Sequence, residues 1–166
     1  MSMAYDRNLE RPNKDHFNRG QHNSDTPFGV YKINRIEGGT DKDRLGKAYG
    51  TGKIVLDAVE GEAKDNGRTG IAIHGGGSML ANPYESEQDL KGTAGCTRCQ
   101  NSDVNELIQL AKGLEKNGDK VDHVFIGDAE YIDSLAHEQN KDGSYKYPDL
   151  RIVQGYDQPP KKKDEK

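Results

Sequence analysis

The chain's two thiols, Cys96 and Cys99, lie in the segment Gly92-Thr93-Ala94-Gly95-Cys96-Thr97-Arg98-Cys99. A thiol reacts as its thiolate, and a neighbouring cation lowers a thiol pKa from its usual value of about 8.5. Arg98 lies two positions after Cys96, among small and polar residues rather than apolar ones. The segment therefore favours Cys96 as a nucleophile.

A nucleophilic thiol needs a base, and His74 is the histidine best placed to supply one. It closes the short apolar run 71–73 and is followed by Gly75-Gly76-Gly77. Glycines leave bare backbone, so we expect an open approach to the imidazole. A Cys–His pair would support thiol catalysis with histidine as general base. The other histidines stay open as partners: His16, His22, His123 and His137.

The Cys-x-x-Cys spacing is also typical of a redox dithiol. The thioredoxin-like arrangement needs a strand just before the motif, and residues 89–95 are not apolar. A zinc site would need two further ligands, and the sequence holds no second Cys-x-x-Cys. We therefore expect no metal and no cofactor, and keep the redox protein as an alternative.

Composition narrows the class of partner. The chain of 166 residues carries 24 basic and 28 acidic side chains, a formal net charge of −4. This balance argues against nucleic-acid binding through bulk charge. No apolar stretch approaches the roughly 18 residues of a membrane span, and the first residues have no apolar core typical of a secretory signal.

The elements that must position these residues are short. Apolar runs bounded by turn residues predict strands over 30–36, 54–59, 71–73, 121–126 and 150–153. Apolar residues at helical spacing from Val104 to Leu114 predict a helix, with Asp103 and Glu106 as its capping box. Asn117-Gly118 should end this helix, and Asp128 should cap a second, shorter one. The lack of regular strand–helix alternation favours a mainly β or α+β domain.

Three segments in order resemble one family. They are Thr26-Pro27-x-Gly29-x-Tyr31-x-Ile33, Ile73-His74-Gly75, and Thr93-x-Gly95-Cys96-x-Arg98 followed by Asn101 and Asp103. Together they resemble the L,D-transpeptidase catalytic domain (YkuD-like) over roughly residues 26–126. The resemblance implies a β-sandwich with one or two short helices. We expect a catalytic domain of 26–156, and composition indicates a polar N-terminal segment of 1–25 before it and a disordered basic tail of 157–166 after it.

The resemblance also implies roles for single residues. Cys96 would be the nucleophile and His74 its base, with the Gly75 carbonyl orienting the imidazole. Backbone N–H groups around Gly95 and Cys96 would form the oxyanion hole, and Arg98 would support the site or hold a substrate carboxylate. Further substrate contacts would come from Thr93, Tyr84 and Lys91.

The sequence departs from the family pattern at three places. Ala94 stands where many members have a second histidine, and Cys99 where a large apolar residue is usual. The stretch 75–92 between the histidine and the cysteine motif is slightly longer than usual. We expect these differences to affect substrate preference more than the identity of the nucleophile.

The family acts on peptidoglycan stem peptides, which implies a thioester on Cys96 formed from a tetrapeptide stem. An amine acceptor would then give a cross-link or an exchanged D-amino acid, and water would give L,D-carboxypeptidase activity. The class alternative is an inactive wall-binding module. We expect action in the periplasm, reached through a secretion system or after removal of a leader.

The segment 67–75, Gly-Arg-Thr-Gly-Ile-Ala-Ile-His-Gly, resembles the arrangement in small effector domains delivered by type VI secretion systems. This favours an antibacterial toxin, which would be paired with an immunity protein. The other possibility for the biological role is a housekeeping wall enzyme.

Overall fold

The computed structural model describes residues 3–4, 19, 24–90 and 92–156. The predictions for Lys91, for the tail 157–166 and for most of the segment 1–25 lie outside these described residues. The chain divides into two compact units, 1–126 and 127–166. Each unit is described by itself below, and the predicted catalytic domain of 26–156 includes parts of both.

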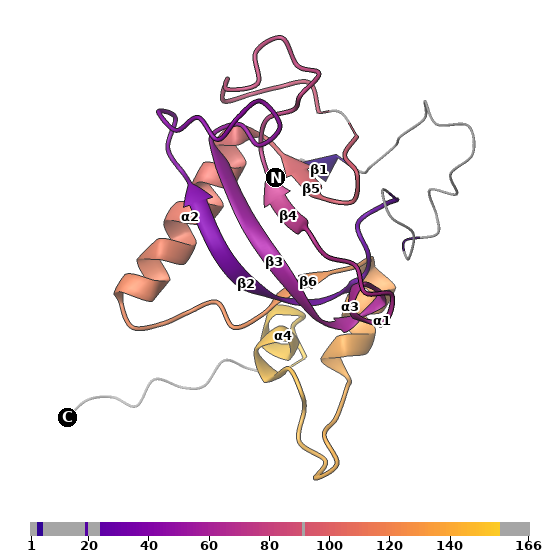
Figure 1. The fold of residues 1–166 in the computed structure, drawn as a ribbon. Coiled ribbons are helices and arrows are strands. Elements are labelled where there is room, and N and C mark those ends of the chain that lie inside the picture. Colours follow the sequence, from indigo (N-terminus) through magenta and orange to yellow (C-terminus); the bar gives the residue numbers. More distant parts are fainter. Residues whose placement is uncertain (1–2, 5–18, 20–23, 91, 157–166) are drawn as a thin grey trace, which may run out of the picture. The chain divides into compact units, whose positions relative to one another are not determined.

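Six strands of the first unit form one mixed sheet in the order β1-β5-β4-β3-β2-β6 (Figure 1). Their bounds are β1 (Met3–Ala4), β2 (Gly29–Gly38), β3 (Gly52–Gly61), β4 (Ile71–His74), β5 (Thr97–Cys99) and β6 (Val124–Ile126). All neighbours are antiparallel except β4 and β5. The α+β class predicted from the sequence is confirmed, and among the described residues the assigned strands all belong to this sheet.

The longest pair of strands, β2 and β3, carries the predicted strands 30–36 and 54–59, each extended at both ends. Two register irregularities interrupt their ladder, between Val30 and Tyr31 and between Ile33 and Arg35. Such irregularities bend a strand and increase its twist. The four-residue helix α1 (Glu62–Asp65) follows directly and leads the chain back toward β4.

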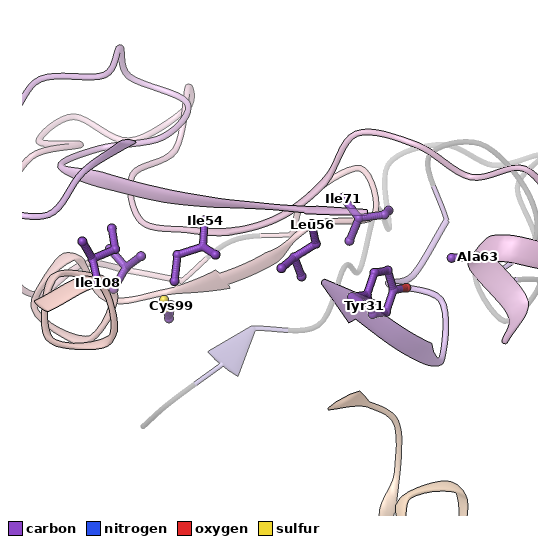
Figure 2. Packing of buried hydrophobic residues seen from close by; sticks show 8 residues of the cluster. Tyr31, Ile54, Leu56, Ala63, Ile71, Cys99 and Ile108 are labelled. Atoms are coloured by element: carbon purple, nitrogen blue, oxygen red, sulfur yellow. The ribbon is translucent and has the colours of Figure 1, made fainter. Parts of the chain in front are cut away.

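Helix α2 (Asn101–Lys116) lies against the β2–β3 hairpin (Figure 1). Its Ile108 is fully buried in a core that also holds Ile54, Leu56 and Cys99 (Figure 2). Burying a side chain of this size contributes about 1.5–3 kcal/mol. A Cβ on Gly52 would lie 2.8 Å from the Ile108 Cδ1, so any larger residue there would require the Ile108 side chain to move.

The predicted capping box at the start of this helix is wrong. The helix begins at Asn101, two residues before Asp103, and Gln100 at the N-cap makes no side-chain capping bond. The Ser102 N–H instead donates to the Ser86 carbonyl at 3.1 Å, so a loop distant in sequence satisfies part of the helix N-terminus. The predicted end at Asn117-Gly118 is confirmed, with Gly118 at φ +87°.

Two other boundaries differ from expectation. The strand predicted over 121–126 begins only at Val124. The strand predicted over 150–153 is wrong, because these residues belong to helix α4 (Pro148–Val153). Pro148 at the helix start has its φ preset for a helix, and the buried Arg151 donates to the Ala136 carbonyl at 3.0 Å.

The second unit contains α4 and helix α3 (Ala129–Ala136). The predicted cap of α3 is confirmed, since the Asp128 Oδ1 accepts a hydrogen bond from the Tyr131 N–H at 2.8 Å. None of the helices in the described part of the chain is both long and apolar enough to cross a bilayer.

Candidate active site

The single parallel strand pair of the sheet brings the His74 and Cys96 segments together. In the β4–β5 register Ile73 faces Thr97 and His74 faces Arg98, and Cys96 directly precedes β5. Because Cys96 comes two residues before Arg98, this register sets Cys96 near the start of β4 and His74 at the end of β4. The Cys96 Sγ accordingly contacts Gly70, the residue just before β4.

The His74 ring is oriented by the backbone of the next residue. Its Nδ1 lies 2.6 Å from the Gly75 carbonyl oxygen. A carbonyl can only accept, so Nδ1 carries the hydrogen and the lone pair of the neutral ring is on Nε2. This tautomer is the one that can take a proton at Nε2.

The surroundings of His74 keep it neutral. The residue is only 4% exposed, and burial is the main reason why its pKa is lowered to about 4. The Gly75 hydrogen bond opposes this shift, whereas the positive charges of Arg98 and Lys53 add to it. At neutral pH the imidazole is therefore an unprotonated base rather than an imidazolium.

Tyr49 and Lys53 belong to the His74 environment and were not predicted from the sequence. The Tyr49 ring meets His74 edge-on, with ring centroids 5.3 Å apart. The Lys53 Nζ lies 4.2 Å from the Tyr49 ring centre and faces His74 across the β3–β4 pair. Since single aromatic and basic residues are frequent in sequences, only the β3–β4 register identifies this group.

Cys96 sits at the end of a tight turn. The Thr93 Oγ1 donates to the Cys96 carbonyl at 2.5 Å, and Gly95 adopts φ +105°, a conformation that favours glycine. The half-buried Cys96 Sγ donates to the Gly70 carbonyl at 3.5 Å. Thr93, predicted as a substrate contact, thus contacts the backbone of Cys96.

The expectation that Gly75-Gly76-Gly77 leaves an open approach is wrong. A Cβ on Gly76 would lie 2.2 Å from the Gly50 nitrogen, and one on Gly75 would lie 2.0 Å from the Asn101 Oδ1. The Gly77 N–H donates to the Lys47 carbonyl at 2.6 Å. Gly75 and Gly76 are needed because the Asn101 side chain packs against the first and the Gly50 backbone against the second.

Asn101, at the start of α2, joins three separate segments. Its Oδ1 accepts hydrogen bonds from the Thr51 N–H at 3.1 Å and the Gly76 N–H at 3.2 Å. Its Nδ2 donates to the carbonyls of Pro83, at 3.0 Å, and Glu85, at 2.6 Å. The motif contains this asparagine, but its function in fixing the loop after His74 becomes visible only in the fold.

The remaining predicted residues are placed differently. Arg98 is buried, with its guanidinium next to Gly77. The centre of the Tyr84 ring lies 4.8 Å from the Arg44 guanidinium carbon, and the prediction of Tyr84 as a substrate contact stays a prediction. Among the described residues there is no group of three or more His, Cys, Asp or Glu side chains that could hold a metal ion.

The second thiol of the motif belongs to the core. Cys99 is fully buried, and its Sγ donates to the His74 carbonyl at 3.8 Å. Burial raises the Cys99 pKa to about 12. A thiol this hard to ionise is a poor partner in thiol–disulfide exchange, which weighs against the redox alternative.

Alkylation should therefore distinguish the two cysteines. Iodoacetamide at pH 8 is expected to add one group to the native protein, on Cys96, and two in urea. Intact-mass spectrometry followed by peptide mapping checks this. The Cys96→Ala variant serves as the control and should take up no label while folded. Native labelling of Cys99 would contradict the burial argument.

The comparison with known families decides the identity of this fold. The sequence model of the L,D-transpeptidase catalytic domain (YkuD) matches residues 10–126. The chain belongs to this family. No curated protein and no solved structure shows a significant match.

The match of the L,D-transpeptidase domain ends at residue 126, where the first compact unit also ends. It contains β4, β5 and α2, and with them His74 and Cys96. The chain is thus an L,D-transpeptidase-type enzyme, and its family connects it to peptidoglycan. The resemblance drawn from the three motifs is confirmed.

Proposed function

We propose that this L,D-transpeptidase domain cleaves tetrapeptide stems of peptidoglycan through a thioester on Cys96. The observation that carries the proposal is the neutral His74, whose Nδ1 hydrogen faces the Gly75 carbonyl and whose lone pair is on Nε2. A base in this state, on the strand next to the cysteine, fits general-base activation of a thiol.

In the first step the Cys96 hydrogen bond to the Gly70 carbonyl breaks and the thiol proton passes to the His74 Nε2. The Sγ attacks the carbonyl carbon of the L-configured centre next to the terminal D-residue. Backbone N–H groups around Gly95 and Cys96 stabilise the oxyanion, a contribution for which a single donor is typically worth about 100- to 1000-fold in rate. The C–N bond then breaks, and His74 protonates the leaving amine.

In the second step an acceptor attacks the thioester carbonyl and gives a proton to His74, and Cys96 leaves as a thiol. An amine acceptor forms a new amide, which is a cross-link or an exchanged D-amino acid. Water gives a tripeptide stem and completes an L,D-carboxypeptidase cycle. No step requires a cofactor.

The test uses purified tetrapeptide muropeptides incubated with the protein, with and without added D-methionine. Mass spectrometry is expected to show loss of terminal D-alanine, or its replacement by D-methionine. Cys96→Ala should remove both products. Cys99→Ala is the matched control and should retain activity, because it removes the other thiol without touching the turn at Cys96.

Two outcomes would overturn the proposal. Equal products with wild-type protein and Cys96→Ala would exclude the Cys96 thioester. Unchanged muropeptides with folded, reduced wild-type protein would favour the inactive wall-binding module. Loss of activity in both cysteine variants, with both folded, would return the redox dithiol to consideration.

The biological setting stays a prediction. The segment 67–75 supports the proposal of an antibacterial effector that acts in the periplasm and is neutralised by an immunity protein. Expression of the domain in a bacterial periplasm, compared with Cys96→Ala, is the direct check on toxicity.

A further inference from the structure

Arg68 is a buried cation that the mechanism above does not use. It lies in the segment between α1 and β4 and is 8% exposed. Its Nη1 donates to the Arg19 carbonyl at 2.7 Å and to the Ser24 Oγ at 3.0 Å. The Arg68 backbone N–H donates to the Ala63 carbonyl at 2.8 Å. The backbone of Arg68 is therefore tied to α1, and its guanidinium is held at Nη1 by two acceptors.

The other end of this guanidinium lies against the turn that carries the nucleophile. A Cβ on Gly95 would lie only 2.2 Å from the Arg68 Nη2. Gly95 is therefore glycine for two reasons, its positive φ and the guanidinium packed on its Cα. The residue bonded to it is Cys96, so the cation stands directly beside the backbone of the nucleophile.

The same segment contacts Cys96 a second time. The Gly70 carbonyl, two residues after Arg68, accepts the Cys96 thiol hydrogen bond. A hydrogen bond to the neutral thiol favours the thiol over the thiolate. The segment 68–70 thus contacts the turn with two groups of opposite effect, a carbonyl that holds the thiol proton and a cation that favours its loss.

We propose that Arg68 is a positioning residue for Cys96, which fixes the turn through Gly95 and stabilises the thiolate by its charge. The inference rests on the proposed role of Cys96 as the nucleophile. A charge acts strongly at a buried site because water screens it poorly.

Other titratable groups come from the elements around this turn. Arg98 comes from β5 and His74, neutral at pH 7, from β4. Asp25 follows Ser24, the hydrogen-bond partner of Arg68. Glu62 is engaged by Arg19 through two hydrogen bonds of 2.7 and 2.8 Å. Arg68 is distinguished from these groups by its contact with the glycine next to Cys96.

The experiment measures the rate of Cys96 alkylation by iodoacetamide as a function of pH, in the full chain. Removing the charge with Arg68→Gln is expected to raise the pH midpoint of alkylation by about one unit. Arg68→Lys keeps the charge and should stay close to the wild-type midpoint. For turnover of tetrapeptide muropeptides, Arg68→Gln should lower kcat by about tenfold or more with little change in KM.

Arg151→Gln is the matched control. Arg151 is equally buried and also donates to a backbone carbonyl, but it lies in the second unit. It should lower the thermal unfolding temperature without moving the alkylation midpoint. If Arg68→Gln does not fold, Ser24→Ala replaces it, because it removes one anchor of the guanidinium and should raise the midpoint by a smaller amount.

A wild-type midpoint in folded Arg68→Gln would overturn the inference, and where that variant does not fold, a wild-type midpoint in Ser24→Ala would do so. So would an equal shift in Arg151→Gln. Alkylation needs no substrate, so the result is separate from the muropeptide test. Active wild-type enzyme with an unmoved midpoint removes only the role of Arg68, whereas an inactive wild type removes the proposed function.

Discussion

Replacing His74 by glutamine should lower kcat/KM for acyl transfer by about 1000-fold, within the range that general acid–base catalysis usually contributes. Glutamine retains a polar group that can donate to the Gly75 carbonyl, but it cannot accept the Cys96 proton. Release of D-alanine from tetrapeptide muropeptides is the measurement. The control is His123→Gln, since His123 lies in the stretch before β6 and outside the site.

The pH dependence follows from the burial of His74. Its pKa is lowered to about 4, so the free enzyme should keep its base unprotonated well below pH 6.5. The acid limb of wild-type kcat/KM is expected near pH 4. An acid limb near pH 6.5 would show that the imidazole is solvated in the working enzyme. Wild-type activity in folded His74→Gln would exclude His74 as the base.

The same pKa has a consequence for stability. In the unfolded chain His74 takes a proton near pH 6.5, whereas in the folded protein it does so only near pH 4. The unfolded state binds more protons in this window, so the His74 contribution is complete above pH 6.5 and is lost as the pH falls to 4. The loss amounts to about 3 kcal/mol. The free energy of unfolding, measured with urea across pH 4–7, should fall more steeply with falling pH in the wild type than in His74→Gln. His123→Gln should show the same pH dependence as the wild type.

The second large effect is expected for Asn101→Ala, which should lower the free energy of unfolding by about 4 kcal/mol, or about 1 kcal/mol for each lost hydrogen bond. The Thr51 and Gly76 N–H groups and the Pro83 and Glu85 carbonyls would lose their partner. Activity should fall too, because the glycine turn after His74 and the loop at 83–85 are held by the same side chain. Urea unfolding at pH 7 measures the first effect and muropeptide turnover the second.

Two further variants separate the contributions. Asn101→Asp keeps the acceptor for Thr51 and Gly76, but its second carboxylate oxygen would face the Pro83 and Glu85 carbonyls, which can only accept. Its loss of stability should therefore be at least as large as that of Asn101→Ala, because the buried charge has no donor on that side. Asn105→Ala is the control one helical turn along, where the side chain bonds to Thr51 Oγ1 and Asp41 Oδ1. It should be destabilised by about 2 kcal/mol and keep its activity. A loss below 1 kcal/mol for Asn101→Ala would contradict the role assigned to this residue.

Local patterns predicted the central elements well. The strands at 30–36, 54–59 and 71–73 and the body of helix α2 follow from apolar periodicity, because each has a face that must be buried. The start of helix α2 could not be predicted in this way. The helix begins without a side-chain cap from Gln100, and the Ser86 carbonyl, from another part of the chain, accepts the Ser102 N–H.

The error over 150–153 has a similar origin. Three apolar residues in a short run are compatible with a strand or a helix, and only Pro148 before them favoured the helix. His74 and Cys96 could be predicted as candidate site residues because each lies in a contiguous motif. Arg68, Tyr49 and the hydrogen bonds of Asn101 were missed because their contacts join residues far apart in the sequence.

The parallel pairing of β4 and β5 has a consequence for how this enzyme can diversify. Parallel neighbours cannot be joined by a tight turn, and here the described residues of the connection, 75–90 and 92–96, belong to no helix or strand. Chain closure depends weakly on length, with about 0.6 kcal/mol for each doubling of a flexible loop. Met79, in this connection, is 84% exposed. Insertions at such an exposed position can change the loop without disturbing the core. The length and sequence of this connection can therefore change during evolution, or be altered by design, while His74 and Cys96 stay unchanged.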